Sequence, residues 1–216
     1  MTWSDSAWTQ IQPIYLRILD MPFIQELIDG SLGEEKFQFY IAQDSNYLEH
    51  FGRALAVIGA RSHETGDSLA FIRFAENAII VEKALHESYF NEFGIKGKVA
   101  AQPACHHYIH FLKSTAAFDA VEVGMASVLP CFWIYKAVGD YILENQSSST
   151  NPYQKWIDTY GGEEFAQAVM KAITICDKAA LGTTEKTRND MMEAFVTATR
   201  LEFDFWDNAY QLKTWV

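Results

Sequence analysis

The stretch EEKFQFYIAQDSNYLEHFGRALAVIGARS, residues 34–62, decides the fold class, because its apolar and aromatic side chains recur three and four positions apart. That spacing is the period of an α-helix with one buried face. The stripe expected to face the core consists of Phe37, Tyr40, Ile41, Tyr47, Leu48, Phe51, Leu55 and Ile58. Just before it, Ser31 and Glu34 have the spacing of a capping box, which would satisfy free amide donors at a helix start. The stretch therefore predicts a long core helix that begins near Glu34.

The same helical period continues through most of the chain, which contains only 5 prolines and 12 glycines. Further helices are expected at about 67–93 (ending at Gly94), 103–114, 118–144, 152–160, 163–181 and 184–212. Residues 145–152, NQSSSTNP, have the composition of a solvated loop. The sequence has no internal repeat and no segment typical of a domain linker. We therefore expect one all-α domain over residues 1–216, a compact bundle of roughly seven or eight helices.

Composition excludes several classes of protein. With 216 residues and 49% hydrophobic content, the chain can fill a large core without disulfides or metals. Its net charge of −11 disfavours nucleic acid and anionic membrane surfaces as partners. The three cysteines, Cys105, Cys131 and Cys176, form no CxxC pair and suit a reducing compartment, so we expect a cytoplasmic protein. The N-terminus does not look like a secretion signal, and no run of about 18 apolar residues predicts a membrane span.

LPCFWIY, residues 129–135, places Pro130 and Cys131 inside an apolar helix. Proline removes a backbone hydrogen bond and clashes with the carbonyl four residues earlier, at a cost of ~3 kcal/mol or more. A distortion there can turn the Cys131 thiol toward a cavity, where a nucleophile can act. The alternative is that Cys131 is a small buried apolar residue, the more common fate of a free cysteine. Tyr135, four residues on, shares the same helix face, either as a core aromatic or as a hydroxyl beside the thiol.

QDSNYL, residues 43–48, interrupts the aromatic helix with consecutive polar side chains. Asp44 lies three positions before Tyr47, which belongs to the predicted buried stripe, so Asp44 borders the core. A carboxylate in that position needs a partner. The partner is either a structural donor or a ligand that presents N–H groups.

LEFDFWDNAY, residues 201–210, places Glu202 on the same helix face as Phe205 and Trp206. Apolar surroundings raise the pKa of a carboxyl group, and a raised pKa suits proton transfer near neutral pH. The alternative is a solvated glutamate at the edge of an apolar stripe.

ACHHYIHFL, residues 104–112, gathers His106, His107 and His110 at spacings compatible with a shared metal. A di-iron helical bundle would need Glu-x-x-His pairs, and the sequence has none. We therefore expect a polar helix face and no metal site. Glycine-rich nucleotide-binding loops, the Gly-x-Ser-x-Gly elbow and His-Glu-x-x-His are also missing from the sequence.

Five motifs, in this order, resemble the TenA family, also called thiaminase II, which has the haem-oxygenase-like helical fold. They are PFIQELIDGSLGEEKFQFYIAQDSNYL (22–48), Tyr108 before IHFL, LPCFWIY (129–135), NPYQKWIDTYGGEEF (151–165) and EFDFWDNAY (202–210). The resemblance covers nearly the whole chain. The cysteine in the LPC motif places the chain with the cysteine-containing branch of the family.

The resemblance implies hydrolysis of a thiamin-derived aminopyrimidine, or of thiamin itself, to hydroxymethylpyrimidine in thiamin salvage. It assigns the nucleophile to Cys131, the pyrimidine-binding carboxylate to Asp44 and the acid/base role to Glu202. It assigns substrate-binding positions to Tyr47, Tyr108, Tyr135 and Tyr160. In this interpretation Tyr47 stacks on the pyrimidine, and the hydroxyls of Tyr108 and Tyr160 stabilise the thiolate. The family implies a small-molecule substrate, no cofactor and a tetramer.

Two other functions stay open at this stage. One is a metal-dependent oxidase or oxygenase of the same helical fold, using the histidines and carboxylates. The other is a non-enzymatic regulatory protein, although the acidic charge and the lack of a helix-turn-helix pattern argue against direct DNA binding. Of the two substrates, we expect the aminomethylpyrimidine to be the better one, because its leaving group needs no space for a thiazole.

Overall fold

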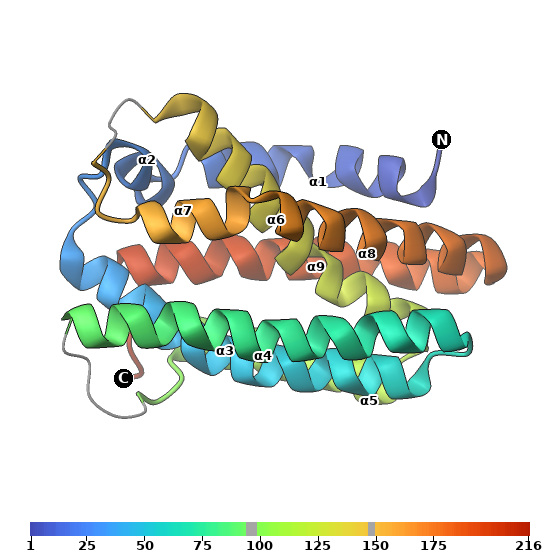
Figure 1. The fold of residues 1–216 in the computed structure, drawn as a ribbon. Helices are drawn as coiled ribbons and strands as arrows, with labels where there is room; N and C mark the ends of the chain where they lie inside the picture. Colours follow the sequence, from blue (N-terminus) through green and yellow to red (C-terminus); the bar gives the residue numbers. More distant parts are fainter. Residues whose placement is uncertain (94–98, 147–149) are drawn as a thin grey trace.

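A computed structural model describes residues 1–93, 99–146 and 150–216, and within these ranges it contains nine α-helices and no strand (Figure 1). The helices are α1 (Trp3–Leu19), α2 (Pro22–Asp29), α3 (Glu34–Arg61), α4 (Thr65–Phe93), α5 (Pro103–Phe118), α6 (Val121–Asn145), α7 (Gln154–Gly161), α8 (Glu163–Gly182) and α9 (Glu185–Tyr210). The all-α prediction is confirmed. The helix number exceeds the prediction because the N-terminal segment divides into α1 and α2. Met21 is the extended N-cap of α2, as expected for a residue that precedes a proline.

The predicted capping box at Ser31 is wrong. The N-cap of α3 is Gly33, and no side chain caps that end of the helix. The Ser31 amide instead donates to the Glu26 carbonyl at 2.9 Å and completes the end of α2. Gly30 makes this turn possible because its φ of 69° is left-handed, a conformation that favours glycine after a helix. The turn residues therefore belong to the helix before them.

Two loop predictions also need correction. The helix expected to end at Ser114 continues to Phe118, and the next begins at Val121. Asn151, in the loop expected to be solvated, is buried: its Nδ2 donates to the Leu27 carbonyl at 2.8 Å, and its Oδ1 accepts from the Tyr153 amide at 2.9 Å. These bonds tie the start of α7 to α2. The predicted helix stop at Gly94 lies outside the described residues, as does part of the 145–152 loop.

The core lies between two groups of helices. α3 packs against α4 and α5, while α9 contacts α6, α1, α3 and α5 and so connects the groups (Figure 1). All eight residues of the predicted α3 stripe are buried. The long amphipathic stretch therefore supplies the central packing surface that its period predicts.

α6 is the core helix that carries LPCFWIY. Among the described residues it is the one helix long and apolar enough to cross a membrane, but 78% of its most apolar window is buried inside the bundle. The core helix of a folded bundle passes the same test. α6 remains helical on both sides of Pro130 and ends only at Asn145. The proline therefore does not terminate the helix.

A close approach of α6 to α7 rests on Gly139. A Cβ atom there would lie 2.8 Å from the Gly161 nitrogen and 2.8 Å from the Tyr160 carbonyl carbon, both backbone atoms that cannot move independently. We expect Gly139→Ala to lower the free energy of unfolding by about 1–3 kcal/mol, measured by urea denaturation. Gly66→Ala is the control, because a Cβ atom at Gly66 meets nothing within 4 Å and should be neutral or slightly stabilising. Equal stability of the two variants would contradict this packing argument.

Candidate active site

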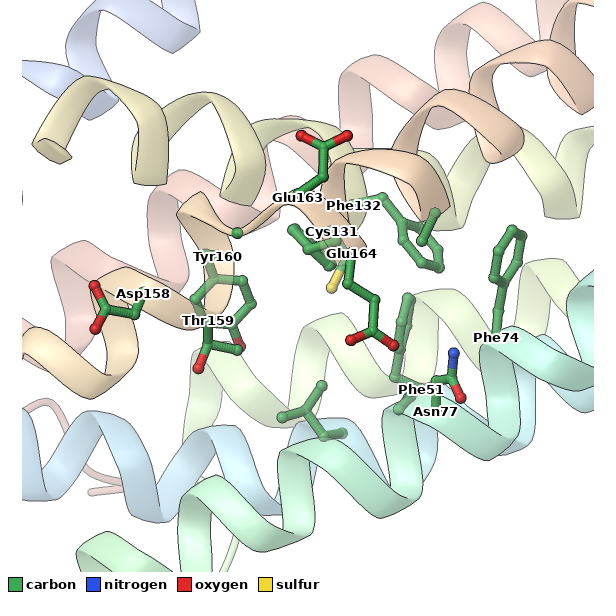
Figure 2. Close-up of a pocket in the computed structure, with 15 residues that line it drawn as sticks. Phe51, Phe74, Asn77, Cys131, Phe132, Asp158, Thr159, Tyr160, Glu163 and Glu164 are labelled. Atoms are coloured by element: carbon green, nitrogen blue, oxygen red, sulfur yellow. The ribbon is translucent and has the colours of Figure 1, made fainter. Parts of the chain in front are cut away.

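A pocket of about 330 Å³ opens between α3, α4, α6, α7 and α8 (Figure 2). This volume is at the lower end of the range for small-molecule sites. Cys131 lines the pocket with only 8% of its surface exposed, and its sulfur points into the open space (Figure 2). Tyr160, at the end of α7, lines the same pocket. The structure therefore brings Cys131 and Tyr160 together and supports the cavity interpretation of the thiol over simple core packing.

Behind Cys131, Tyr47 of α3 and Tyr108 of α5 lie in the protein interior with ring centroids 4.7 Å apart. Burial, followed by the neighbouring Cys131 thiol, raises the pKa of Tyr47 well above its ordinary value. Within the described part of the chain the Tyr47 hydroxyl has no hydrogen bond of regular geometry. As a neutral phenol it is a donor placed beside the thiol.

The Tyr108 hydroxyl donates to Glu202 Oε1 at 2.7 Å, and both side chains are buried. In the structure this hydroxyl therefore donates to the carboxyl group and not to the thiol, and its contribution to a thiolate stays a prediction. A phenol has one hydrogen to donate, and a buried carboxyl oxygen is the stronger acceptor. Tyr47 occupies the position beside the thiol instead.

Glu202, on α9, is only 1% exposed. Burial raises its pKa from 4.5 to about 8, with a smaller contribution from the negative charge of Asp44, whereas the hydrogen bond from Tyr108 lowers it. The group is therefore mostly protonated at neutral pH and close to its titration point. Burial of this side chain, which its place in LEFDFWDNAY predicts, is the largest cause of the shift.

Asp44 is 1% exposed, and it borders the core as its spacing from Tyr47 predicts. Its neighbour Gln43 was not predicted as a site residue. The Gln43 side chain donates through Nε2 to the Ala100 carbonyl at 3.1 Å and accepts from the Gln102 amide at 2.7 Å. These bonds hold the start of α5 against α3. The polar run QDSNYL was the available signal: Asp44 lies close enough to Glu202 to raise its pKa, and Gln43 supports the backbone that leads to Tyr108.

Tyr135 lies in an aromatic cluster deeper in the core. Its hydroxyl forms a 3.2 Å hydrogen bond with the Tyr40 hydroxyl, which also accepts from Trp156 Nε1 at 3.2 Å. The Tyr135 ring lies 4.8 Å from Tyr160 and 4.8 Å from Trp206, measured between centroids. Tyr135 thus connects the pocket wall to the core. Tyr40 and Trp156 complete this network, and sequence spacing did not identify them as neighbours of the site.

The site divides into an outer and an inner part. The outer pocket contains Cys131 and Tyr160, while the other predicted site residues lie in the adjoining interior rather than on its wall. Sequence patterns did not identify the four phenylalanines of the outer pocket, which are Phe51, Phe74, Phe132 and Phe165. Their apolar spacing looked like ordinary core packing, and only the tertiary structure shows that they meet around a cavity.

His106, His107 and His110 lie on an exposed face of α5. The rings of His106 and His110 stack with centroids 4.0 Å apart, and His110 Nδ1 is 2.8 Å from the His106 carbonyl oxygen. Among the described residues, no group of three or more His, Cys, Asp and Glu side chains is arranged to hold a metal ion. The three histidines also lie apart from the pocket.

Fold and site together define a helical protein with a thiol at a small-molecule pocket and, behind it, a buried carboxyl group whose pKa is raised. The chain belongs to the TENA/THI-4/PQQC family, which matches residues 8–212. It is 33% identical over 199 residues to the aminopyrimidine aminohydrolase of Bacillus subtilis, covering 90% of this chain and 84% of the relative. It is 30% identical over 220 residues to the aminopyrimidine aminohydrolase of Halalkalibacterium halodurans, covering 100% and 98%.

The chain is also similar to one segment of a longer relative. The chain is 35% identical over 205 residues to the thiamine biosynthesis multifunctional protein ThiED of Corynebacterium efficiens, covering 94% of this chain but spanning only 28% of that relative. Among solved structures, a TenA homologue from Pyrococcus horikoshii superposes with a TM-score of 0.89 at 26% identity, covering 98% of this chain and 99% of that one. A haem-oxygenase-like protein from Shewanella denitrificans, 16% identical, superposes with a TM-score of 0.76 and covers 94% of this chain and 90% of its own. The predicted fold class is confirmed.

Proposed function

We propose that this chain hydrolyses the aminomethyl form of the thiamin pyrimidine to hydroxymethylpyrimidine and ammonia, and also cleaves thiamin to hydroxymethylpyrimidine and thiazole. The observation that carries the proposal is the pairing of the Cys131 thiol, open to a pocket, with Glu202, a buried carboxyl group of raised pKa that shares Tyr47 and Tyr108 as neighbours with the thiol. Two relatives that match nearly the whole chain are named aminopyrimidine aminohydrolases, which agrees with this chemistry.

The proposed reaction begins with the Cys131 thiolate. Direct displacement at the methylene is slow because an amine is a poor leaving group. Addition of the thiolate to the electron-poor pyrimidine ring forms a C–S bond and lets the ring electrons expel the leaving group from the methylene. Water then adds to the methylene, and loss of the thiolate restores the aromatic ring. The Tyr47 hydroxyl, which lies beside the thiol, stabilises the thiolate by donating to it.

Glu202 carries the protons in this scheme. In its neutral form it donates a proton to the ring or to the departing amine, and as a carboxylate it then accepts a proton from the attacking water. A pKa of about 8 suits both steps near neutral pH. The hydrogen bond from Tyr108 fixes the orientation of the carboxyl group, so we assign Tyr108 a positioning role.

Asp44 and the tyrosines orient the ring in our proposal. The Asp44 carboxylate accepts N–H donors from the pyrimidine amino group or a protonated ring nitrogen. Tyr47, Tyr135 and Tyr160 supply aromatic surfaces along the path from the pocket to the interior, worth roughly 0.5–1.5 kcal/mol for each good ring contact. The side chains of the chain suffice for every step.

The setting of the proposed activity follows from the family and the composition. We propose that residues 1–216 act as one catalytic domain in thiamin salvage and that the protein works in the cytoplasm, as its free thiols suggest. We also propose a homotetramer, by analogy with the family.

The activity is tested by incubating the purified chain separately with aminomethylpyrimidine and with thiamin, and quantifying hydroxymethylpyrimidine by chromatography. We expect catalytic turnover of the aminomethylpyrimidine, unchanged after treatment with a chelator. If neither substrate gives hydroxymethylpyrimidine, the proposal is wrong. Stoichiometric iron in the purified protein, with activity lost on chelation, would favour the metal-dependent alternative.

A further inference from the structure

Four phenylalanine rings surround the outer pocket. Phe132 of α6 is central, with its ring centroid 5.2 Å from Phe74, 5.6 Å from Phe51 and 6.4 Å from Phe165. These rings come from four different helices and line one cavity together with Cys131. The faces of aromatic rings carry partial negative charge and attract organic cations. The aromatic wall therefore fits a flat cationic group as well as an apolar one.

The charged side chains around the pocket favour a cationic ligand over an apolar one. Asp158, Glu163 and Glu164 line it, and none of the lining residues that the structure describes carries a positive charge. Figure 2 shows the Glu164 carboxylate reaching into the space between Cys131 and Asn77, whereas the Glu163 carboxylate points away from it. Within the described ranges, Glu164 takes part in no ion pair. A carboxylate in that position is available to a cationic ligand.

We infer that the outer pocket binds a positively charged heteroaromatic leaving group, the thiazolium of thiamin, and that Glu164 is the residue that selects it. The inference rests on the proposed function, because it places the pyrimidine against Cys131 at the inner end of the pocket. A leaving group attached through one methylene then extends outward between the phenylalanines. An ammonium group on the same methylene is one ring shorter and stays beside the thiol.

This arrangement favours substrate over product. When the bond between the methylene and the thiazolium nitrogen breaks, the electron pair stays on that nitrogen and the thiazole departs neutral. Thiamin cation and water thus give neutral hydroxymethylpyrimidine, neutral thiazole and a proton. The attraction of Glu164 and of the aromatic faces for the leaving group disappears in the same step. The pocket therefore holds the charged group before cleavage and releases it afterwards.

Glu163 serves as the control for a purely structural role of Glu164. Glu163 and Glu164 both lie in the first turn of α8, where carboxylates stabilise a helix through its dipole. Both side chains are exposed, and both substitutions to glutamine remove one charge from that turn. Of the two, only Glu164 extends its carboxylate into the cavity (Figure 2). The pair therefore separates binding of a cation from stabilisation of α8.

The test measures dissociation constants by calorimetry in a Cys131→Ser background, which should not cleave the ligand. We expect Glu164→Gln to weaken thiamin binding about tenfold and Glu163→Gln to weaken it less than twofold. Hydroxymethylpyrimidine, which has the same ring and no cation, should bind with less than twofold change in both variants. Raising the ionic strength should weaken thiamin binding more than hydroxymethylpyrimidine binding.

Three results would overturn the inference: equal effects of the two substitutions, an equal loss of hydroxymethylpyrimidine binding, or no thiamin binding at all. Turnover of aminomethylpyrimidine by the unmodified protein tests the proposed function separately, because its short leaving group does not reach Glu164. The chain can therefore keep its aminohydrolase activity while this inference fails. Conversely, if the unmodified protein does not turn over aminomethylpyrimidine but its thiamin binding depends on Glu164, the proposed function fails while this inference holds.

Discussion

Replacing Cys131 by serine is expected to lower kcat/KM for aminomethylpyrimidine by about 1000-fold or more, because the covalent route depends on the thiolate. A serine hydroxyl has nearly the same size but is almost entirely protonated at neutral pH, and it is a far weaker nucleophile than a thiolate. The sulfur points into the pocket, so the substitution should change little of the packing (Figure 2). Steady-state kinetics with chromatographic detection of hydroxymethylpyrimidine measures the loss.

Cys176 supplies the matched control for this prediction. It is a second buried free thiol, on α8, and it is not part of the pocket wall. Burial raises its pKa above the ordinary range, which makes it inert as a nucleophile. Cys176→Ser should keep kcat/KM within about twofold of the unmodified protein, provided that thermal unfolding shows it to be folded. Full turnover by Cys131→Ser would rule out the covalent mechanism.

The sequence predicted those parts of the site that depend on one helix at a time. Asp44 and Tyr47 follow from the period of α3, and the apolar surroundings of Glu202 follow from its spacing to Phe205 and Trp206. Such patterns are local, because residues three and four apart share a helix face whatever the rest of the chain does. The burial of these side chains agrees with the spacing.

The sequence could not predict which groups meet across helices. Tyr108 and Glu202 are 94 positions apart, and their hydrogen bond depends on how α5 packs against α9. The orientation of Glu164 depends on the turn at Gly162 between α7 and α8. The prediction at Ser31 failed for a related reason. The capping-box spacing before α3 overlaps the turn that ends α2, and in the structure the Ser31 amide bonds to α2. The sequence shows which side chains can do chemistry, but the packing of the helices determines which of them are in contact.

Glu202→Gln is expected to reduce kcat/KM by about 100- to 1000-fold, the usual contribution of a general acid or base. In the unmodified protein, kcat/KM should fall as the pH rises through about 8, because the form of Glu202 that donates the proton is then lost. Glutamine does not titrate, so the residual activity of the variant should lack this decrease. Its carbonyl oxygen can still accept from Tyr108, which keeps the local structure. A pH–rate profile of both proteins, from pH 6 to 9.5, measures the difference.

The same raised pKa predicts an opposite effect on stability. In the folded state Glu202 has a pKa of about 8, while in the unfolded chain it has its ordinary value of 4.5. Below pH 4.5 both states carry the proton; as the pH rises toward 8 only the folded state holds it, so stability falls through this range. We expect Glu202→Gln to gain about 2 kcal/mol or more relative to the unmodified protein between pH 4.5 and pH 9, seen as a difference in Tm that widens with pH. A difference in Tm that stays constant with pH would mean that burial does not hold the proton on Glu202. If Glu202→Gln instead loses activity while it gains stability, the folded protein keeps a destabilising carboxyl group for its chemistry.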